Sequence, residues 1–288
     1  MSIGVFNYFS KYKYKLCSKV FYLPIKKNGV VQVFPEEEQK EEEITYCIPL
    51  HEYLSSYGIR IVTEKNDKHL HRPSTYTAAV LPLFLEAMDS GRSFVVMMKG
   101  LRDSYRQVQQ KSIVKLAIPH ELATFLQKIE YPLPDNNWLD KPAIEYLIGG
   151  WLEEWVYTCV KECLGLPDEA IRYGVRVARP NAGGDPVPNE CDLLFTFNNT
   201  LYLVECKSGL GFKPKQLFEE SVYKLTALRI EFGQRVEALF LTLSNLRDRK
   251  GRLKSVFLHR AQLHRVTLFD RKGVEKDLER YLKGLKDG

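Results

Sequence analysis

The chain has 288 residues, of which 44% are hydrophobic and 27% charged, and a formal net charge of +6. This composition excludes a disordered or fibrous protein, and the small positive charge is only a weak indication of an anionic partner. The longest apolar stretch, residues 78–85, is far shorter than the roughly 20 residues of a membrane-spanning helix. Because we also see no signal peptide, we expect a cytoplasmic protein with no membrane partner.

The N-terminal part of the chain predicts an α+β region of unknown role. Two β-rich runs, Val20–Ile25 and Val30–Phe34, flank Asn28-Gly29, a dipeptide typical of a tight hairpin turn. The acidic run Pro35–Glu43 cannot pack in a core and is predicted to be a linker or an exposed loop. These residues predict structure but assign no function.

Three further elements are predicted before the domain boundary. They are an apolar helix over Tyr76–Met88, a buried strand over Ser93–Met98 and an amphipathic helix over Pro119–Ile129. The turn-rich segment Tyr131–Lys141 follows them, so we expect one domain over residues 1–135 and a second over residues 136–288.

The second domain has a regular order of elements. The predicted elements are a helix over Pro142–Leu164, strands over Ile171–Ala178, Glu190–Phe197 and Thr200–Lys207, a helix over Pro214–Phe232, and a strand over Val236–Leu243. A Pro/Gly-rich loop, Pro180–Pro188, interrupts the strands. The fold class is therefore α/β, with a core of one helix, three strands, a second helix and a fourth strand, and with the N-terminal α+β region separate from it.

A hairpin joins the second and third of these strands. Asn198-Asn199 predicts a two-residue turn, and this turn sets a register in which Asp192 lies directly opposite Glu205. Because side chains alternate along a strand, Lys207 shares the face of the two carboxylates. The hairpin therefore gathers two carboxylates and one amine on one face.

The other face of the hairpin is predicted to be apolar. The same register places Cys191 opposite Cys206 on that face. A cytoplasmic cysteine pair of this kind is more often two buried thiols than a disulfide or a metal site, so we expect free thiols.

The polar face predicts phosphodiester chemistry. Opposed carboxylates repel each other unless a cation lies between them. Mg²⁺ is typically held by one or two carboxylates together with a substrate phosphate, which matches Asp192 and Glu205. Lys207 would orient or help deprotonate the attacking water and offset the phosphate charge. The alternative is an exposed strand edge with alternating charges.

At these residues the sequence resembles the PD-(D/E)xK nuclease superfamily. Asp192 is followed, after a gap of 12 residues, by Glu205-Cys206-Lys207, which is similar to the D…ExK core of that superfamily. The sequence departs from the motif at Cys191, where the superfamily has proline. The resemblance implies a restriction-endonuclease-like core that binds Mg²⁺ or Mn²⁺ through Asp192, Glu205 and the backbone carbonyl of Cys206.

The superfamily also implies a further acid on the helix before the strands. That acid would be Glu153 or Glu154, and we prefer Glu153 because it flanks the packed stripe of the helix. Lys224, on the helix after the site, could contact phosphate or be a surface lysine. The predicted catalytic residues are therefore Glu153, Asp192, Glu205 and Lys207, with Glu154 and Lys224 as additional candidates.

A narrower resemblance covers roughly residues 142–245. The stretches GGWLEEWVY, NECDLLFTFNNTLYLVECKSG and SVYKLTAL are similar to the nuclease half of CARF-linked CRISPR ancillary nucleases of the Can and Card type. In that family, a sensor domain for cyclic oligoadenylate controls a C-terminal nuclease, which implies a role in antiviral defence. Residues 1–141 show neither the apolar first strand nor the phosphate-binding loop of such a sensor, so we do not predict one, and cyclic oligoadenylate is only a candidate ligand.

The leading hypothesis is a metal-dependent nuclease that acts on DNA or RNA. The alternative is a catalytically silent module that binds nucleic acid or a partner on a nuclease fold. A homodimer is expected, since symmetric dimers are the commonest oligomers. The basic segment from Leu246 to Gly288, with 13 Lys and Arg against 6 Asp and Glu, would extend the nucleic-acid surface.

Overall fold

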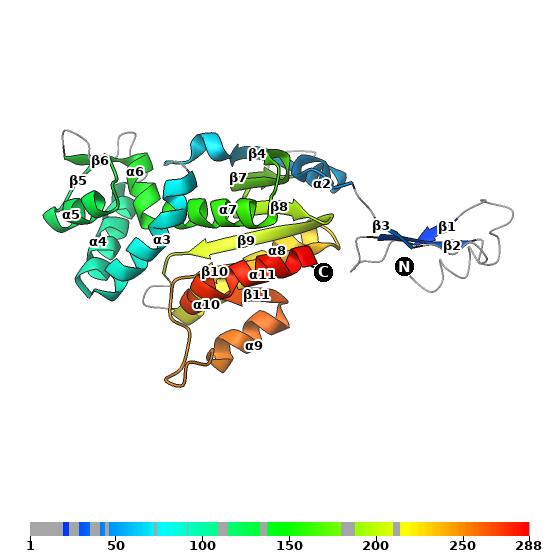
Figure 1. Ribbon diagram of the computed structural model, residues 1–288. Coiled ribbons are helices and arrows are strands. Elements are labelled where there is room, and N and C mark those ends of the chain that lie inside the picture. The colour runs from blue at the N-terminus through cyan, green and yellow to red at the C-terminus, as the bar shows by residue number, and fades with distance from the viewer. Residues whose placement is uncertain are drawn as a thin grey trace.

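The structure of the chain is a computed structural model (Figure 1). It describes residues 20–22, 29–34, 41–43, 46–71, 74–90, 92–108, 115–132, 137–179, 188–209 and 214–287. Within these ranges, no helix is both long enough and apolar enough to cross a membrane.

A six-stranded mixed sheet forms the centre of the molecule, in the order β11-β10-β9-β8-β7-β4. Three strands form an antiparallel meander: β7 (Ile171–Ala178), β8 (Asn189–Phe197) and β9 (Thr200–Lys207). Strand β10 (Val236–Thr242) runs parallel to β9, and β11 (Val266–Phe269) runs parallel to β10. The predicted α/β core, with its strands close to their expected bounds, is therefore confirmed.

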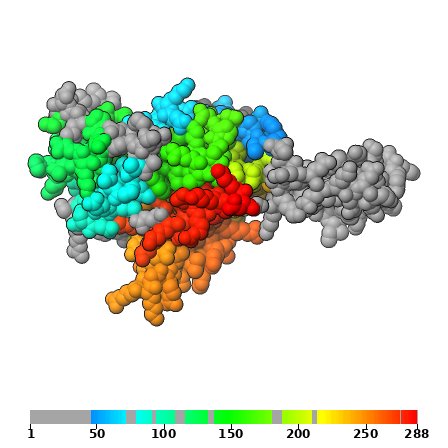
Figure 2. All heavy atoms as spheres, in the orientation of Figure 1, coloured from blue at the N-terminus to red at the C-terminus, as the bar shows by residue number. Residues whose placement is uncertain are grey.

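Helices cover both faces of this sheet (Figure 1). The first face packs against α3 (Ser74–Asp89), α6 (Lys141–Glu145), η3 (Tyr146–Gly150), α7 (Trp151–Leu164), α10 (Arg271–Lys276) and α11 (Leu278–Asp287). The second face packs against α2 (Leu50–Ser56), α8 (Pro214–Glu231) and α9 (Ser255–Leu263). Helix α11 lies along α7 on the side that Figure 2 presents.

The predicted helix over Pro142–Leu164 is confirmed as the continuous run α6-η3-α7. Its middle part, η3, is a turn of π-helix that ends at Gly149-Gly150. A π-helical turn widens the helix locally and is often found at functional sites. This π-helical turn packs in the core of the first face of the sheet.

Most elements of the N-terminal part agree with those predicted from the sequence. Strands β1 (Val20–Tyr22) and β2 (Gly29–Phe34) pair antiparallel, as the predicted hairpin requires, while its turn lies outside the described residues. The prediction of an unstructured acidic run is wrong at its end, because β3 (Glu41–Glu43) pairs with β2. Charged residues are common on edge strands, where they discourage further pairing.

The predicted buried strand over Ser93–Met98 is wrong. These residues belong to helix α4 (Arg92–Val108). The apolar run continues at Leu101 and Tyr105, both buried, and this three-four spacing favours a helix once the window is extended. The other two elements predicted here are confirmed as helices, α3 and α5 (His120–Lys128).

Residues on both sides of position 135 share the central sheet. Strand β4 (Arg60–Lys65) pairs antiparallel with β7 and forms one edge of it. Helices α3, α4 and α5 contribute buried side chains to the same core as α7. A small sheet of β5 (Lys115–Ala117) and β6 (Trp138–Asp140) joins residues on the two sides of position 135. Two short 3₁₀ turns, η2 (Asp67–His69) and η4 (Asp168–Ala170), lie elsewhere in the chain.

The two central cysteines do not face each other, contrary to the prediction. Cys206 lies in the core of the first face, whereas Cys191 lies in the core of the second. Along β7, Tyr173 and Val175 are likewise buried on opposite faces, although residues two apart should share one. The turnover occurs at Gly174, whose φ of 54° is readily adopted by glycine. Both cysteines are free thiols, as expected.

Candidate active site

The hairpin of β8 and β9 brings Asp192, Glu205 and Lys207 together. Its ladder runs from Phe197 paired with Thr200 to Leu193 paired with Val204, in the predicted register. Just beyond this ladder, the Asp192 carboxylate accepts a 2.7 Å hydrogen bond from the backbone N–H of Cys206. Lys207 Nζ lies 3.9 Å from Asp192 Oδ2 and 2.6 Å from Glu205 Oε1.

A second lysine joins the group from helix α8. Lys224 Nζ lies 2.6 Å from Glu205 Oε2, so each oxygen of this carboxylate contacts a different ammonium group. Lys224 is partly buried and lies on the helix that packs against the second face of the sheet. Neither reading of Lys224 from the sequence, a phosphate contact or a surface lysine, included this contact with Glu205.

Burial and like charge dominate the electrostatics of the group. Asp192 and Glu205 are only 8% and 3% exposed. Burial, and then repulsion from Glu205, raises the pKa of Asp192 to about 6. Burial lowers the pKa of Lys207, but the Asp192 and Glu205 carboxylates outweigh it, so that pKa lies above its ordinary value. The lysine is therefore a permanent cation beside the two acids.

The two glutamates of helix α7 have different surroundings. Burial, and then the charge of Asp192, raises the pKa of Glu153 to about 8, so Glu153 lies within electrostatic reach of the carboxylate group. Glu154 is 2% exposed and turns to His71, accepting hydrogen bonds from its backbone N–H at 3.1 Å and pairing with Nδ1 at 2.6 Å. Glu154 thus anchors the segment after η2, and Glu153 is the acid that lies near the site.

The sequence analysis missed Lys65, at the end of strand β4. Its positive charge opposes the rise in the pKa of Glu153, and its side chain passes over Gly174 and towards the ring of Tyr173. No local pattern could have identified this lysine, because β4 reaches β7 across more than 100 residues of chain. Only the pairing of the two strands brings it to the acids.

The donor set fits a hard divalent cation. Carboxylate oxygens are the ligands that Mg²⁺ and Mn²⁺ prefer. A cation beside Asp192 and Glu205 would offset the cost of burying their negative charges and the repulsion between them, both of which raise the pKa of Asp192. Among the described residues, no three His, Cys, Asp or Glu side chains converge as a closed cage. Two carboxylates are the usual protein ligands of Mg²⁺, which keeps several of its waters.

These residues meet at one place in the sheet. Glu205 and Lys207 lie at the carboxyl end of β9, whose parallel neighbour β10 ends beside them, with Thr242 paired to Lys207. Helix α7 brings Glu153 from one face, and helix α8 brings Lys224 from the other. The mixed sheet, covered on both faces, has the restriction-endonuclease-like fold, and its acids and amines could together hold a phosphate and a metal ion.

Comparisons with known proteins agree with this class. Residues 140–283 match the family model of the Card1-like endonuclease domain. The chain therefore belongs to the Card1-like endonuclease family, and it is a nuclease of the CARF-linked type. No curated protein matches the chain significantly.

Two solved structures share the fold. One is the protein VC1899 from Vibrio cholerae, with a TM-score of 0.68 and 18% identity over 98% of this chain and 70% of that one. The other is Can2 from Sulfobacillus thermosulfidooxidans in complex with cyclic tetra-adenylate, with a TM-score of 0.65 and 17% identity over 95% of this chain and 72% of that one. At these identities the likeness concerns the fold alone.

The sequence analysis predicted no sensor domain, and a second family match corrects this prediction. Residues 1–53 match the model of the Card1 CARF domain. This match is short, and it includes β1, β2 and β3. The sequence analysis had looked for an apolar first strand followed by a phosphate-binding loop, and it recognised neither in residues 1–141.

Proposed function

We propose that the chain is a divalent-metal-dependent nuclease that hydrolyses phosphodiester bonds at the Asp192, Glu205 and Lys207 group. The observation that carries this proposal is a pair of buried carboxylates with Lys207 Nζ 2.6 Å from one and 3.9 Å from the other. Buried charges are costly to maintain unless they are paired or ligate a cation, so a group of this kind is unusual without a chemical role.

Each residue has a distinct role in this proposal. Asp192 and Glu205, with the backbone carbonyl of Cys206, would hold Mg²⁺ or Mn²⁺, and a bound metal ion of this kind polarises the phosphate and activates water. Lys207 orients the attacking water and offsets negative charge on the phosphate. Glu153 is the additional acid, since it is buried on helix α7 within electrostatic reach of Asp192, whose charge raises its pKa.

The regulation of the nuclease follows from its CARF segment. We infer that cyclic oligoadenylate activates cleavage, because residues 1–53 match the Card1 CARF domain and a structure of the same fold has cyclic tetra-adenylate bound. This assigns the protein to CRISPR-associated defence, in which a signal molecule releases a nuclease. We also propose a homodimer, in which two sites face one nucleic-acid substrate.

Cleavage assays with labelled single- and double-stranded DNA and RNA test this function. We expect cleavage with Mn²⁺ or Mg²⁺, loss of cleavage with EDTA, and stimulation by cyclic tetra-adenylate. Asp192→Asn should remove cleavage, whereas Glu162→Gln, an exposed acid on helix α7, should not. Binding without cleavage of any of the four substrates would instead support the silent binding module.

A further inference from the structure

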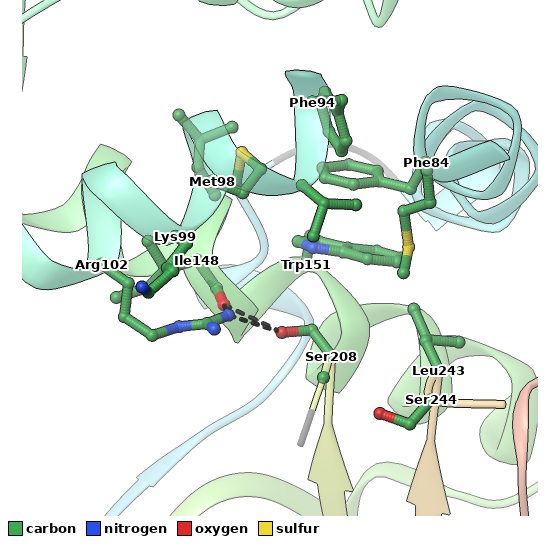
Figure 3. Close-up of a pocket in the computed structure, with 14 residues that line it drawn as sticks. Phe84, Phe94, Met98, Lys99, Arg102, Ile148, Trp151, Ser208, Leu243 and Ser244 are labelled. Atoms are coloured by element: carbon green, nitrogen blue, oxygen red, sulfur yellow. Dashed lines mark hydrogen bonds between the residues drawn. The ribbon is translucent and has the colours of Figure 1, made fainter. Parts of the chain in front are cut away.

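An arginine of helix α4 joins the π-helical turn η3 to the residue that follows strand β9. Arg102 Nη2 donates to the carbonyl of Ile148 at 2.9 Å and to Ser208 Oγ at 3.1 Å, and Ser208 Oγ donates to the same carbonyl at 3.0 Å. The three residues line one side of a cavity of about 330 Å³ (Figure 3). We call this group of Arg102, Ile148 and Ser208 the Arg102 clamp.

The clamp is connected to the candidate site through the backbone. Ser208 directly follows Lys207, the last residue of β9. Neighbouring residues of an extended chain project to opposite sides, so the Ser208 hydroxyl points away from the carboxylates that Lys207 contacts. The clamp therefore touches none of the reacting groups, but it holds the chain at the position next to Lys207.

The strand end that carries Lys207 has little other support. The ladder between β8 and β9 runs only as far as the pair Leu193 and Val204, whereas the ladder with β10 continues to the pair Thr242 and Lys207. Within the described ranges, the last residues of β9 therefore pair with a strand on one side only. A strand end with few backbone hydrogen bonds opens more easily than the middle of a sheet. A fixed point directly after Lys207 limits this opening.

Helix α4 is itself firmly attached to the turn that the clamp uses. One helical turn after Arg102, Tyr105 Oη donates to Glu145 Oε1 at 2.5 Å, directly before η3. Leu101 and Tyr105 are buried in the core of the first face. The turn is therefore bound to α4 at Glu145 and at Ile148, and it provides a rigid anchor for Ser208.

Arg102 is placed at some cost in free energy. It is partly buried, and burial, followed by repulsion from Arg106, lowers the pKa of its guanidinium group. Its hydrogen bonds go to a carbonyl and a hydroxyl, and in the part of the chain that the structure describes no carboxylate forms an ion pair with it. Burying a charge without an opposite charge is unfavourable, so this arrangement is unusual unless its hydrogen bonds have a purpose.

We propose that Arg102 is a positioning residue for Lys207. Through Ser208 it holds the end of β9 against the π-helical turn, and this keeps the Lys207 ammonium group in place beside Asp192 and Glu205. The inference rests on the proposed nuclease function, in which Lys207 orients the attacking water. Arg102 and Ser208 act on the rate of cleavage without contacting the substrate.

Substitution of the clamp residues tests this role. Arg102→Met keeps the apolar stem but removes both donated hydrogen bonds. We expect single-turnover cleavage with Mn²⁺ to slow by roughly tenfold to a hundredfold, since a displacement of about 1 Å in a catalytic group can cost about 10² in rate. Substrate affinity should stay close to that of the wild type, because the loss concerns the chemical step. The matched control is Arg106→Met, whose side chain on the same helix is 68% exposed.

Two smaller changes keep the test valid if Arg102→Met fails to fold. Ser208→Ala removes only the hydroxyl group that links the strand end to the turn, and it should slow cleavage in the same way. Ser208→Thr retains the hydroxyl and should restore most of the rate. Equal rates for Ser208→Ala, Ser208→Thr and the wild type would overturn the inference.

A double-mutant cycle distinguishes positioning from a general loss of structure. If Arg102 acts through Lys207, the Arg102→Met substitution should have almost no further effect in a Lys207→Ala chain, because the group that it positions is gone. A merely structural role predicts that Arg102→Met slows both chains by the same factor. That additive result, in folded proteins, contradicts the proposal.

Hydrogen exchange separates this inference from the proposed function, because it needs no cleavage. Mass spectrometry follows exchange in the peptide over residues 204–208. Exchange there should be faster in Arg102→Met and Ser208→Ala than in the wild type and Arg106→Met. Unchanged exchange in the clamp variants contradicts the inference even if the chain is a nuclease. A wild-type chain that cleaves no labelled DNA or RNA with Mg²⁺ or Mn²⁺ contradicts the nuclease proposal, while the exchange rates still decide whether the clamp holds the strand end.

Discussion

Lys224 Nζ lies 2.6 Å from Glu205 Oε2, while Lys207 Nζ lies 2.6 Å from the other oxygen of the same carboxylate. One lysine comes from the strand that carries Glu205 and the other from helix α8, on the second face of the sheet. The paired ammonium groups compensate the charge of a side chain that is only 3% exposed. The two lysines and the carboxylates of Asp192 and Glu205 thus form a group with two positive and two negative charges.

Replacement of Lys224 by methionine should weaken cleavage by roughly tenfold or more, because a charged hydrogen bond of this kind contributes about 1.5–3 kcal/mol. Methionine keeps the length and the apolar stem of lysine, so the helix should stay packed. Lys215→Met, an exposed lysine on the same helix, is the matched control. Equal cleavage rates for the two variants would assign Lys224 a surface role only.

Lys207→Ala should slow the cleavage step far more than it weakens metal binding. Lys207 orients water and supplies charge, and general acid–base groups typically contribute about 10²–10⁴ in rate. Single-turnover cleavage at saturating Mn²⁺ measures the loss, and calorimetry measures Mn²⁺ affinity in the same preparation. Loss of Mn²⁺ binding in a folded Lys207→Ala chain would contradict the assigned role.

Substitutions of the two neighbouring glutamates of α7 should have different effects, one on cleavage and the other on stability. Glu153→Gln removes a carboxyl group that the charge of Asp192 influences, so we expect slower cleavage with an unchanged or slightly higher free energy of unfolding. Glu154→Ala leaves the His71 backbone N–H without its acceptor and should lower that free energy by about 1–3 kcal/mol. Denaturant unfolding and cleavage assays on both variants distinguish the two outcomes. The reverse pattern would exchange the roles of the two residues.

The loop after β10 should contribute contacts to the nucleic-acid backbone. It starts at the carboxyl end of β10, and Arg247 anchors it through two contacts of 2.9 Å to the buried carboxylate of Asp270. Beyond this anchor, Arg249 and Lys250 are exposed. Each phosphate contact releases counterions, so replacing both residues by glutamine should reduce the slope of log affinity against log salt by about 2.

The control for this loop is a pair of cations elsewhere on the surface. Arg280 and Lys283 of helix α11 are 80% and 63% exposed in their side chains. Replacing both by glutamine makes the same change in net charge. A salt slope that falls equally in the two double variants would mean that the loop responds only to overall charge.

The parts of the fold and site that depend on local pattern could be predicted from the sequence. Strand β9 follows from a β-rich run with a turn before it, and the turn Asn198-Asn199 fixes the register of the hairpin, which depends only on neighbouring residues. That register is sufficient to bring Asp192 to the strand of Glu205 and Lys207. The helix that contains Ser93–Met98 was predicted as a strand, because so short an apolar run does not distinguish a strand from a helix.

Features that depend on contacts between distant segments could not be predicted in this way and are evident only in the folded chain. The pairing of β4 with β7 brings Lys65 to Glu153, and the turn towards His71 separates Glu154 from the site. The side-chain alternation of β8 breaks between Cys191 and Leu193, next to Gly174 of β7, and the two cysteines therefore lie in different cores. Neither hydrophobic periodicity nor motif spacing contains this information, because the free energy of each contact depends on which surfaces meet when the whole chain packs.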